Sequence, residues 1–299
     1  MRPMMMRLAA EFNRRQPNAK ISVEGGGSVI ALPEFLGKST YTRPKNVPPW
    51  HKNAAPPSLI IASSRDLTSE EISRFVSTHG YEPTGVPVAM DAVAIYVHKD
   101  NPLPGLSLEQ LDAILSSTRK RGYPHDLKSW DQLGLDKGWA QAPIHLYGRN
   151  LKSGTRGFVK DHVLLNGEFD PNVQEEPGAA SVILALSRDP LGLAYSGIGL
   201  VTSSVRAIPL AEGEGKPFVE PTARTVMDGS YPLRRLLYLY VDKSGDAPLS
   251  SVAEEFLSFL KSRDGQEAVM KVGFYPLSQG QLDRAVTALI PASPNLRPQ

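Results

Sequence analysis

The stretch "GRNLKSGTRGF", residues 148–158, lies where a short apolar strand pattern changes into a helix pattern. The strand pattern is "APIHLYG", and the turn that follows it carries Arg149, Ser153, Gly154 and Thr155. The same change from strand to helix recurs at "KISVEGGGS" and at "SLIIASSRDLTSEE". Strands that alternate with helices in this way predict an α/β fold with mostly parallel sheets.

Hydrophobic spacing and capping patterns predict the other elements. A first helix follows from Met5, Leu8 and Phe12, which share one face of a 3.6-residue period. The patterns "TSEE" from Thr68 and "SLEQ" from Ser107 are capping boxes that begin helices, and Ser251 with Glu254 is predicted to cap a last long helix. Further strands are expected within residues 88–99, 191–200, 205–210 and 234–242, a short helix through Phe35, a helix within 178–190, a loop insertion at 38–58 and a loose tail at 291–299.

Composition excludes several classes of function. A chain of 299 residues with 41% hydrophobic content supports one large domain or two lobes. The net charge of +2 gives no basic footprint for nucleic acid, and the absence of cysteine excludes disulfides and thiol catalysis. The six histidines show no i, i+4 pair, so we expect neither a metal site nor a cofactor. No apolar run is long enough to span a membrane, and "MRPMMMRLAAEF" does not have the pattern of a secretory signal.

The turn at residues 149–155 has the groups that an oxyanion needs. A helix N-terminus carries free N–H groups and a partial positive charge, and it binds anions when it points into a cleft. Ser153 and Thr155 add hydroxyl donors, Gly154 allows close approach, and the Arg149 guanidinium fits a tetrahedral oxyanion with two parallel hydrogen bonds. Taken alone, Ser-Gly-Thr before a helix is equally an ordinary N-cap.

Two further turns favour the anion-binding interpretation. "VEGGGS" places Ser28 at the start of a helix pattern, and "IIASSRDLT" offers Ser63, Ser64 and Arg65 after a strand. Ligands of open α/β sheets lie beyond the carboxyl ends of the strands, where all three turns fall. Together they predict a cleft that binds a small tetrahedral oxyanion.

The same segments resemble the phosphate-binding proteins that serve bacterial ABC phosphate importers. "YGRNLKSGTRGFV" resembles that family's Arg-x-x-x-Ser-Gly-Thr segment. "GYEPTGVPVAMDAVAIYVHKDNPLPGLSLEQLDAILS" resembles its hinge strand, Asn-Pro turn and helix, and "SWDQLGL" its Trp-x-x-Leu-Gly stretch. "LAYSGIGLV", "YPLRRLLYLYVDK" and "FLSFLKSRDGQEAVMKVGFYPL" follow in the family's order, so that the resemblance covers most of residues 8–278.

The resemblance implies a two-lobed fold of the type found in periplasmic binding proteins, with crossing hinge strands and a ligand cleft between the lobes. Residues 1–92 with 229–299 would form the first lobe and residues 93–228 the second. By correspondence with the family's motifs, Ser28, Arg149, Ser153, Gly154 and Thr155 fall on phosphate-contacting positions, with Ser64 beside them. The implied protein is a monomer at the periplasm or cell surface that passes inorganic phosphate to a membrane permease.

The sequence departs from the family in two places. The family has an aspartate in the turn where this chain has Ser64, and a serine brings no charge to accept the hydrogen of a protonated phosphate. The family's first strand and its ligand-contacting loop have no counterpart before "MRPMMM". We therefore expect Met1 to be an internal methionine of a longer gene product.

Several alternatives stay open on the sequence alone. The oxyanion could be sulfate, molybdate or tungstate, or the protein could sense phosphate without transport. An enzyme that acts on phosphate esters is disfavoured, because no metal cluster and no Ser-His-Asp constellation is visible. A scaffold that no longer binds a ligand is a further alternative, given the absent first loop. The basic cluster "RKRG" at 119–122 is either a solvated loop or a docking surface for a membrane partner.

Overall fold

The computed structural model describes residues 1–19, 21–24, 28–37, 60–136, 138–199, 202–241, 243 and 249–287. The chain forms two compact units. Unit 1 comprises Met1–Ala89, Leu237–Val269 and Pro276–Gln299, and unit 2 comprises Met90–Leu236 and Met270–Tyr275. The boundaries predicted for the two ligand-binding lobes, after residue 92 and after residue 228, stay a prediction. The predicted loop at 38–58 and the tail at 291–299 lie outside the described residues.

Unit 1 combines segments from both ends of the chain. Its strand β1 (Ile60–Ser63) pairs antiparallel with the second half of β9 (Arg234–Val241), so that Ile60 is opposite Val241 and Ser63 is opposite Tyr238. The helices are α1 (Arg2–Arg15), α2 (Ser28–Leu36), α3 (Ser69–His79), α8 (Ser251–Lys261), α9 (Arg263–Met270) and α10 (Gln279–Thr287).

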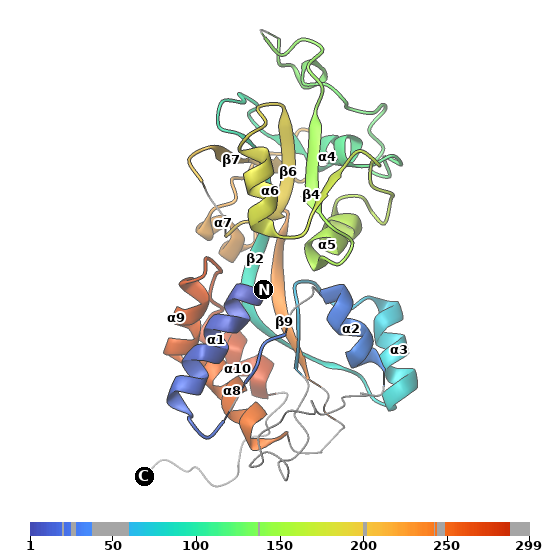
Figure 1. The fold of residues 1–299 in the computed structure, drawn as a ribbon. Coiled ribbons are helices and arrows are strands. Elements are labelled where there is room, and N and C mark those ends of the chain that lie inside the picture. The colour runs from blue at the N-terminus through green and yellow to red at the C-terminus, as the bar shows by residue number, and fades with distance from the viewer. Residues whose placement is uncertain are drawn as a thin grey trace. The chain divides into compact units, whose positions relative to one another are not determined.

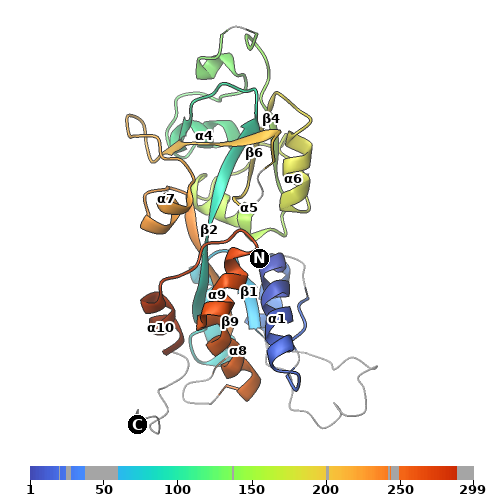
Figure 2. The ribbon, with the colours of Figure 1, turned by 90° about the vertical axis from the view of Figure 1, so that its left-hand side faces the viewer.

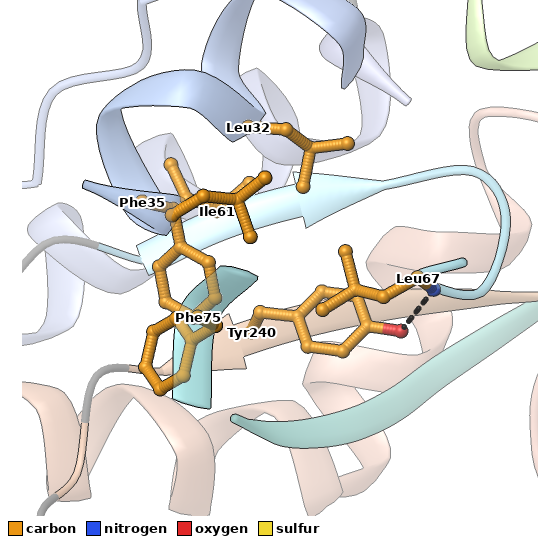
Figure 3. Packing of buried hydrophobic residues seen from close by; sticks show 7 residues of the cluster. Leu32, Phe35, Ile61, Leu67, Phe75 and Tyr240 are labelled. Atoms are coloured by element: carbon orange, nitrogen blue, oxygen red, sulfur yellow. Dashed lines mark hydrogen bonds between the residues drawn. The ribbon is translucent and has the colours of Figure 1, made fainter. Parts of the chain in front are cut away.

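An aromatic and aliphatic cluster holds α2 and α3 against β1 and β9 (Figure 3). The Phe35 and Phe75 rings stack with centroids 4.8 Å apart, and the Tyr240 hydroxyl accepts the Leu67 backbone N–H at 3.2 Å. The cluster consists of Leu32, Phe35, Leu36, Ile61, Leu67, Phe75 and Tyr240. It therefore fixes both the helix that begins at Ser28 and the turn that follows β1.

The predicted first helix is confirmed. The Met5, Leu8 and Phe12 side chains are buried, as their spacing requires. Phe12 packs edge-on against Phe256 with ring centroids 5.4 Å apart, and α1 lies beside α8 in both ribbon views (Figures 1 and 2).

The prediction of a strand at residues 20–24 is wrong for residues 21–24, the part of it that the structure describes, because these residues form no strand. The Asn13 side chain instead bonds the backbone of Ile21 twice, accepting its N–H at 2.9 Å and donating to its carbonyl at 3.0 Å. In a strand, the backbone N–H and carbonyl groups bond to a partner strand. An alternating pattern of apolar and polar residues does not by itself supply that partner.

Unit 2 is built around β2 (Thr84–His98), a strand whose middle is buried on both faces. Its other strands are β3 (Leu106–Ser107), β4 (His145–Arg149), β5 (Gln174–Glu176), β6 (Gly192–Gly197), β7 (Val205–Ile208) and β8 (Leu210–Ala211). Its helices are α4 (Leu108–Leu115), the 3₁₀ turn η2 (Asp131–Leu133), α5 (Gly154–His162), α6 (Ala179–Leu186) and α7 (Ala223–Asp228). Helix α6 packs on β4 and β6 (Figure 1).

The strand pairing is mixed rather than mostly parallel. Strand β4 is parallel to β5 and β6, as expected of strands joined through helices, and β3 is parallel to β8. Strand β2, however, pairs antiparallel with β6 and with β7. A continuous apolar run predicts a buried strand, but its side chains do not record the direction of its neighbours.

The predicted helix starts are largely confirmed. Thr68 and Ser107 both form complete capping boxes, with Glu71 and Gln110 as the reciprocal side chains. The start of α8 was predicted one residue too late, because Ser250 rather than Ser251 is the N-cap and accepts the Ala253 N–H. Two adjacent serines satisfy the same pattern, and only the backbone conformation selects between them.

Thr68→Ala should lower the free energy of unfolding by about 1 kcal/mol, since it removes the acceptor for the Glu71 N–H. Ser69→Ala, one residue later in the same helix, is the matched control and should change it by less than about 0.5 kcal/mol. Urea titrations of both variants test this. An equal loss in both would show that the capping box does not stabilise α3.

Candidate functional site

The turn between β4 and α5 is built as predicted. Strand β4 ends at Arg149, and α5 begins after its N-cap Ser153, whose hydroxyl oxygen accepts the Thr155 N–H at 3.2 Å. Ser153, Gly154 and Thr155 are all buried. The structure therefore brings four of the predicted residues together at one helix N-terminus, where the first N–H groups have no partner within the helix.

Arg149 is anchored through its backbone, and part of its side chain has no partner among the described residues. Its carbonyl accepts hydrogen bonds from the Tyr195 hydroxyl and from Arg156 Nη1, both at 3.3 Å. Its Nη2 donates to the Pro177 carbonyl at 3.2 Å, whereas its Nε is buried with no hydrogen-bond partner among the described residues. Burial and then the nearby Arg235 charge lower the pKa of Arg149.

A buried ion pair adjoins this turn. Arg235 on β9 donates from Nε and Nη2 to Asp91 Oδ2 on β2, at 3.0 and 2.6 Å. The two side chains are only 5% and 2% exposed. Arg235 Nη2 also donates to the Thr155 hydroxyl at 3.0 Å, so the ion pair is bonded directly to the first turn of α5.

In these contacts two hydroxyl groups act as hydrogen-bond acceptors. The Thr155 hydroxyl oxygen accepts from Arg235, and the Ser153 hydroxyl oxygen accepts from the Thr155 N–H. Each hydroxyl thereby keeps its own proton available to donate to a further group. The turn consequently presents hydroxyl protons, backbone N–H groups and guanidinium N–H groups, a set that suits a ligand whose atoms are hydrogen-bond acceptors.

Arg235 was not predicted as a site residue. Its partner Asp91 is buried and accepts both of these hydrogen bonds. The signal for Arg235 was its place in "RRLLYLYV", where Arg234 is exposed and Arg235 falls on a buried position. An arginine in register with buried strand positions requires a partner for its charge.

The structure brings Ser28 and Ser64 together in unit 1. Both side chains are buried, and the Ser64 N–H lies 3.4 Å from the Ser28 hydroxyl oxygen. Arg65 from the same turn pairs with Glu71 at 2.7 Å, so its charge is used in holding α3. Asp66, the next residue of this turn, is exposed.

The other charged clusters in the described part of the chain serve structural contacts. No group of three or more metal-ligating side chains occurs among the described residues, and no helix there could cross a membrane. In the basic cluster at 119–122, Arg119 pairs with Asp126, and Arg121 donates to the carbonyls of His162 and Val163. These arginines thus serve contacts within unit 2.

Comparison with known proteins defines the class. A family model described as "PBP superfamily domain" matches residues 1–264. The phosphate-binding protein PstS of Pseudomonas aeruginosa is 41% identical over 286 residues, which cover 96% of this chain and 83% of that protein. The chain therefore belongs to the PBP superfamily and, within it, to the family of the PstS phosphate-binding proteins.

Solved structures confirm the expected fold. An ABC-type phosphate transport receptor from Vibrio cholerae aligns with a TM-score of 0.66 and 22% identity, over 92% of this chain and 95% of that one. A high-affinity periplasmic phosphate-binding protein, PfluDING, solved with bound phosphate, aligns with a TM-score of 0.61 and 16% identity, over 92% and 96%. At these identities the likeness concerns the fold, which is that of the type 2 periplasmic binding proteins.

Gly148→Ala should lower the free energy of unfolding by about 1–3 kcal/mol, because the new methyl group would overlap the buried Tyr195 ring, 2.6 Å from its hydroxyl oxygen. Gly280→Ala is the control, since the nearest atom to its Cβ is the flexible end of Arg284 at 3.8 Å. Urea midpoints of the two variants give the comparison. Wild-type stability in Gly148→Ala would mean that the Tyr195 ring moves aside freely.

Proposed function

We propose that this protein binds inorganic phosphate and delivers it to an ABC-type importer. The observation that carries the proposal is the donor set at the start of α5, formed by the buried residues Ser153, Gly154 and Thr155 and by Arg149, whose Nε is buried. Each phosphate oxygen accepts hydrogen bonds, and the phosphate charge compensates that of the half-buried Arg149 guanidinium. Membership in the PstS family supports phosphate as the ligand, and the protein is a solute-binding protein, not an enzyme.

Ser28 and Ser64 are proposed as further ligand residues. In unit 1 the Ser64 N–H is directed at the Ser28 hydroxyl oxygen, so the Ser28 proton stays available to donate. A serine at position 64 offers a neutral acceptor for a protonated phosphate oxygen. We therefore expect weaker rejection of sulfate than a carboxylate at that position would give, because sulfate carries no proton at neutral pH.

The expected partner is the membrane permease of an ABC importer, and the expected location is the periplasm or the cell surface. Both expectations come from the family, whose relatives include a protein described as a periplasmic phosphate-binding protein and another described as a transport receptor. A monomer is expected for a protein that delivers its ligand by docking on a permease. Size-exclusion chromatography with light scattering measures the oligomeric state.

Arg149→Ala should weaken phosphate binding at least about tenfold, because it removes charge-assisted hydrogen bonds of roughly 1.5–3 kcal/mol each. Isothermal calorimetry with phosphate measures the change, and sulfate serves as the competitor. Arg224→Ala is the matched control, since Arg224 is an exposed arginine of unit 2, 91% accessible, on α7. Equal affinity in wild type and Arg149→Ala would remove Arg149 from the site, and wild type that binds sulfate but not phosphate would reassign the ligand.

A further inference from the structure

We propose that Arg235 is a second guanidinium ligand of the bound oxyanion and that Asp91 is the residue that positions it. This inference rests on the proposed function and adds a residue to the same site. It follows from the hydrogen-bond state of the Arg235 side chain, from the charge balance of its surroundings, and from its direct bond to the first turn of α5.

The hydrogen bonds of Arg235 are incomplete. Its Nε and Nη2 both donate to the single oxygen Oδ2 of Asp91, and Nη2 also donates to the Thr155 hydroxyl. Its Nη1 is buried and has no hydrogen-bond partner among the described residues. Because a buried charged donor without a partner is strongly unfavourable, an acceptor from outside the protein is the natural partner of Nη1.

A second buried donor of the same kind lies nearby. Arg149 Nε is also buried without a partner in the described part of the chain. The pKa of Arg149 is lowered first by burial and second by the positive charge of Arg235. The two guanidinium groups are therefore close enough for their charges to interact. Two arginines with unpaired donors beside one helix N-terminus are the arrangement that a tetrahedral oxyanion would complete.

The charge balance points the same way. Among the described contacts, Asp91 is the only carboxylate that bonds to Arg235, and no carboxylate pairs with the guanidinium of Arg149. The three side chains therefore carry one net positive charge, with Asp91 and Arg235 buried and Arg149 half-buried. The α5 N-terminus adds a partial positive charge. A dianionic oxyanion relieves the repulsion between the two guanidinium groups.

The orientation of Arg235 is set by groups other than the ligand. Asp91 holds its Nε–Nη2 edge, and the Phe158 ring lies with its centroid 5.4 Å from the guanidinium carbon. Holding one edge of a planar guanidinium also determines where its opposite corner, Nη1, points. The alternative is a purely structural role, in which Arg235 only neutralises Asp91.

Four variants separate these two roles: Arg235→Gln, Arg235→Lys, Asp91→Asn, and the double variant Asp91→Asn with Arg235→Gln. We expect Arg235→Gln to weaken phosphate binding by roughly tenfold or more in calorimetry, and Arg235→Lys to weaken it less, because lysine keeps the charge but loses the fork. The double variant removes both charges of the pair together. It should remain as weak as Arg235→Gln if Arg235 binds the ligand.

Asp91→Asn gives a second readout. It leaves Arg235 buried without its counter-charge, so the protein without ligand should melt at a lower temperature. Phosphate should then raise the melting temperature of Asp91→Asn more than that of wild type, because the anion supplies the missing negative charge. This measurement holds even if Arg235→Gln does not fold.

Arg206→Gln is the control for a merely destabilised arginine. The Arg206 guanidinium in unit 2 donates to the carbonyls of Asn101 and Leu103, so its loss should lower stability and leave phosphate affinity unchanged. Wild-type affinity in the double variant, or an unchanged affinity in Arg235→Gln, would overturn the inference while leaving the proposed function intact. If wild type itself binds no phosphate, the proposed function fails and this inference fails with it.

Discussion

The buried ion pair between Asp91 and Arg235 is the interaction on which the candidate site in unit 2 depends. It joins β2 to β9, the two strands within which the chain passes between unit 1 and unit 2, and it extends to α5 through the Thr155 hydroxyl. Removing one partner of such a pair typically costs about 3–5 kcal/mol, because the other charge is left buried and uncompensated. The pair therefore constrains two long strands and a helix start at once.

The anion site follows from this constraint together with the helix geometry. A helix start has free N–H groups whatever its sequence, but an ordinary N-cap is exposed to water. Here the start of α5 is buried, and the side chains around it accept hydrogen bonds in a way that leaves their own protons to donate. Burial strengthens each of these interactions, since the local dielectric is lower than that of water. The tightly packed Gly148 and Tyr195 support the same turn from the strand side.

Local patterns were reliable where neighbouring residues alone decide the structure. The capping boxes at Thr68 and Ser107 formed as expected, because the bonds involved connect residues three positions apart. The turn from Arg149 to Thr155 was likewise predictable, since a strand, a hydroxyl cap and a helix pattern follow one another directly. The prediction of a strand at 20–24 was wrong for residues 21–24, because a strand depends on a partner that is distant in sequence. There the Asn13 side chain bonds the backbone of Ile21 instead.

The sequence by itself determined the alternation of strands and helices, the position of most helix starts, and the hydroxyl-rich turn with its arginine. Those features arise from periodicity and from bonds between residues close in the chain. Only the tertiary structure decided that β2 runs antiparallel to β6 and β7, and that Arg235 reaches both Asp91, 144 residues away, and Thr155, 80 residues away. Contacts at such separations depend on how whole strands pair and pack, and a single sequence does not record that pairing in any local pattern.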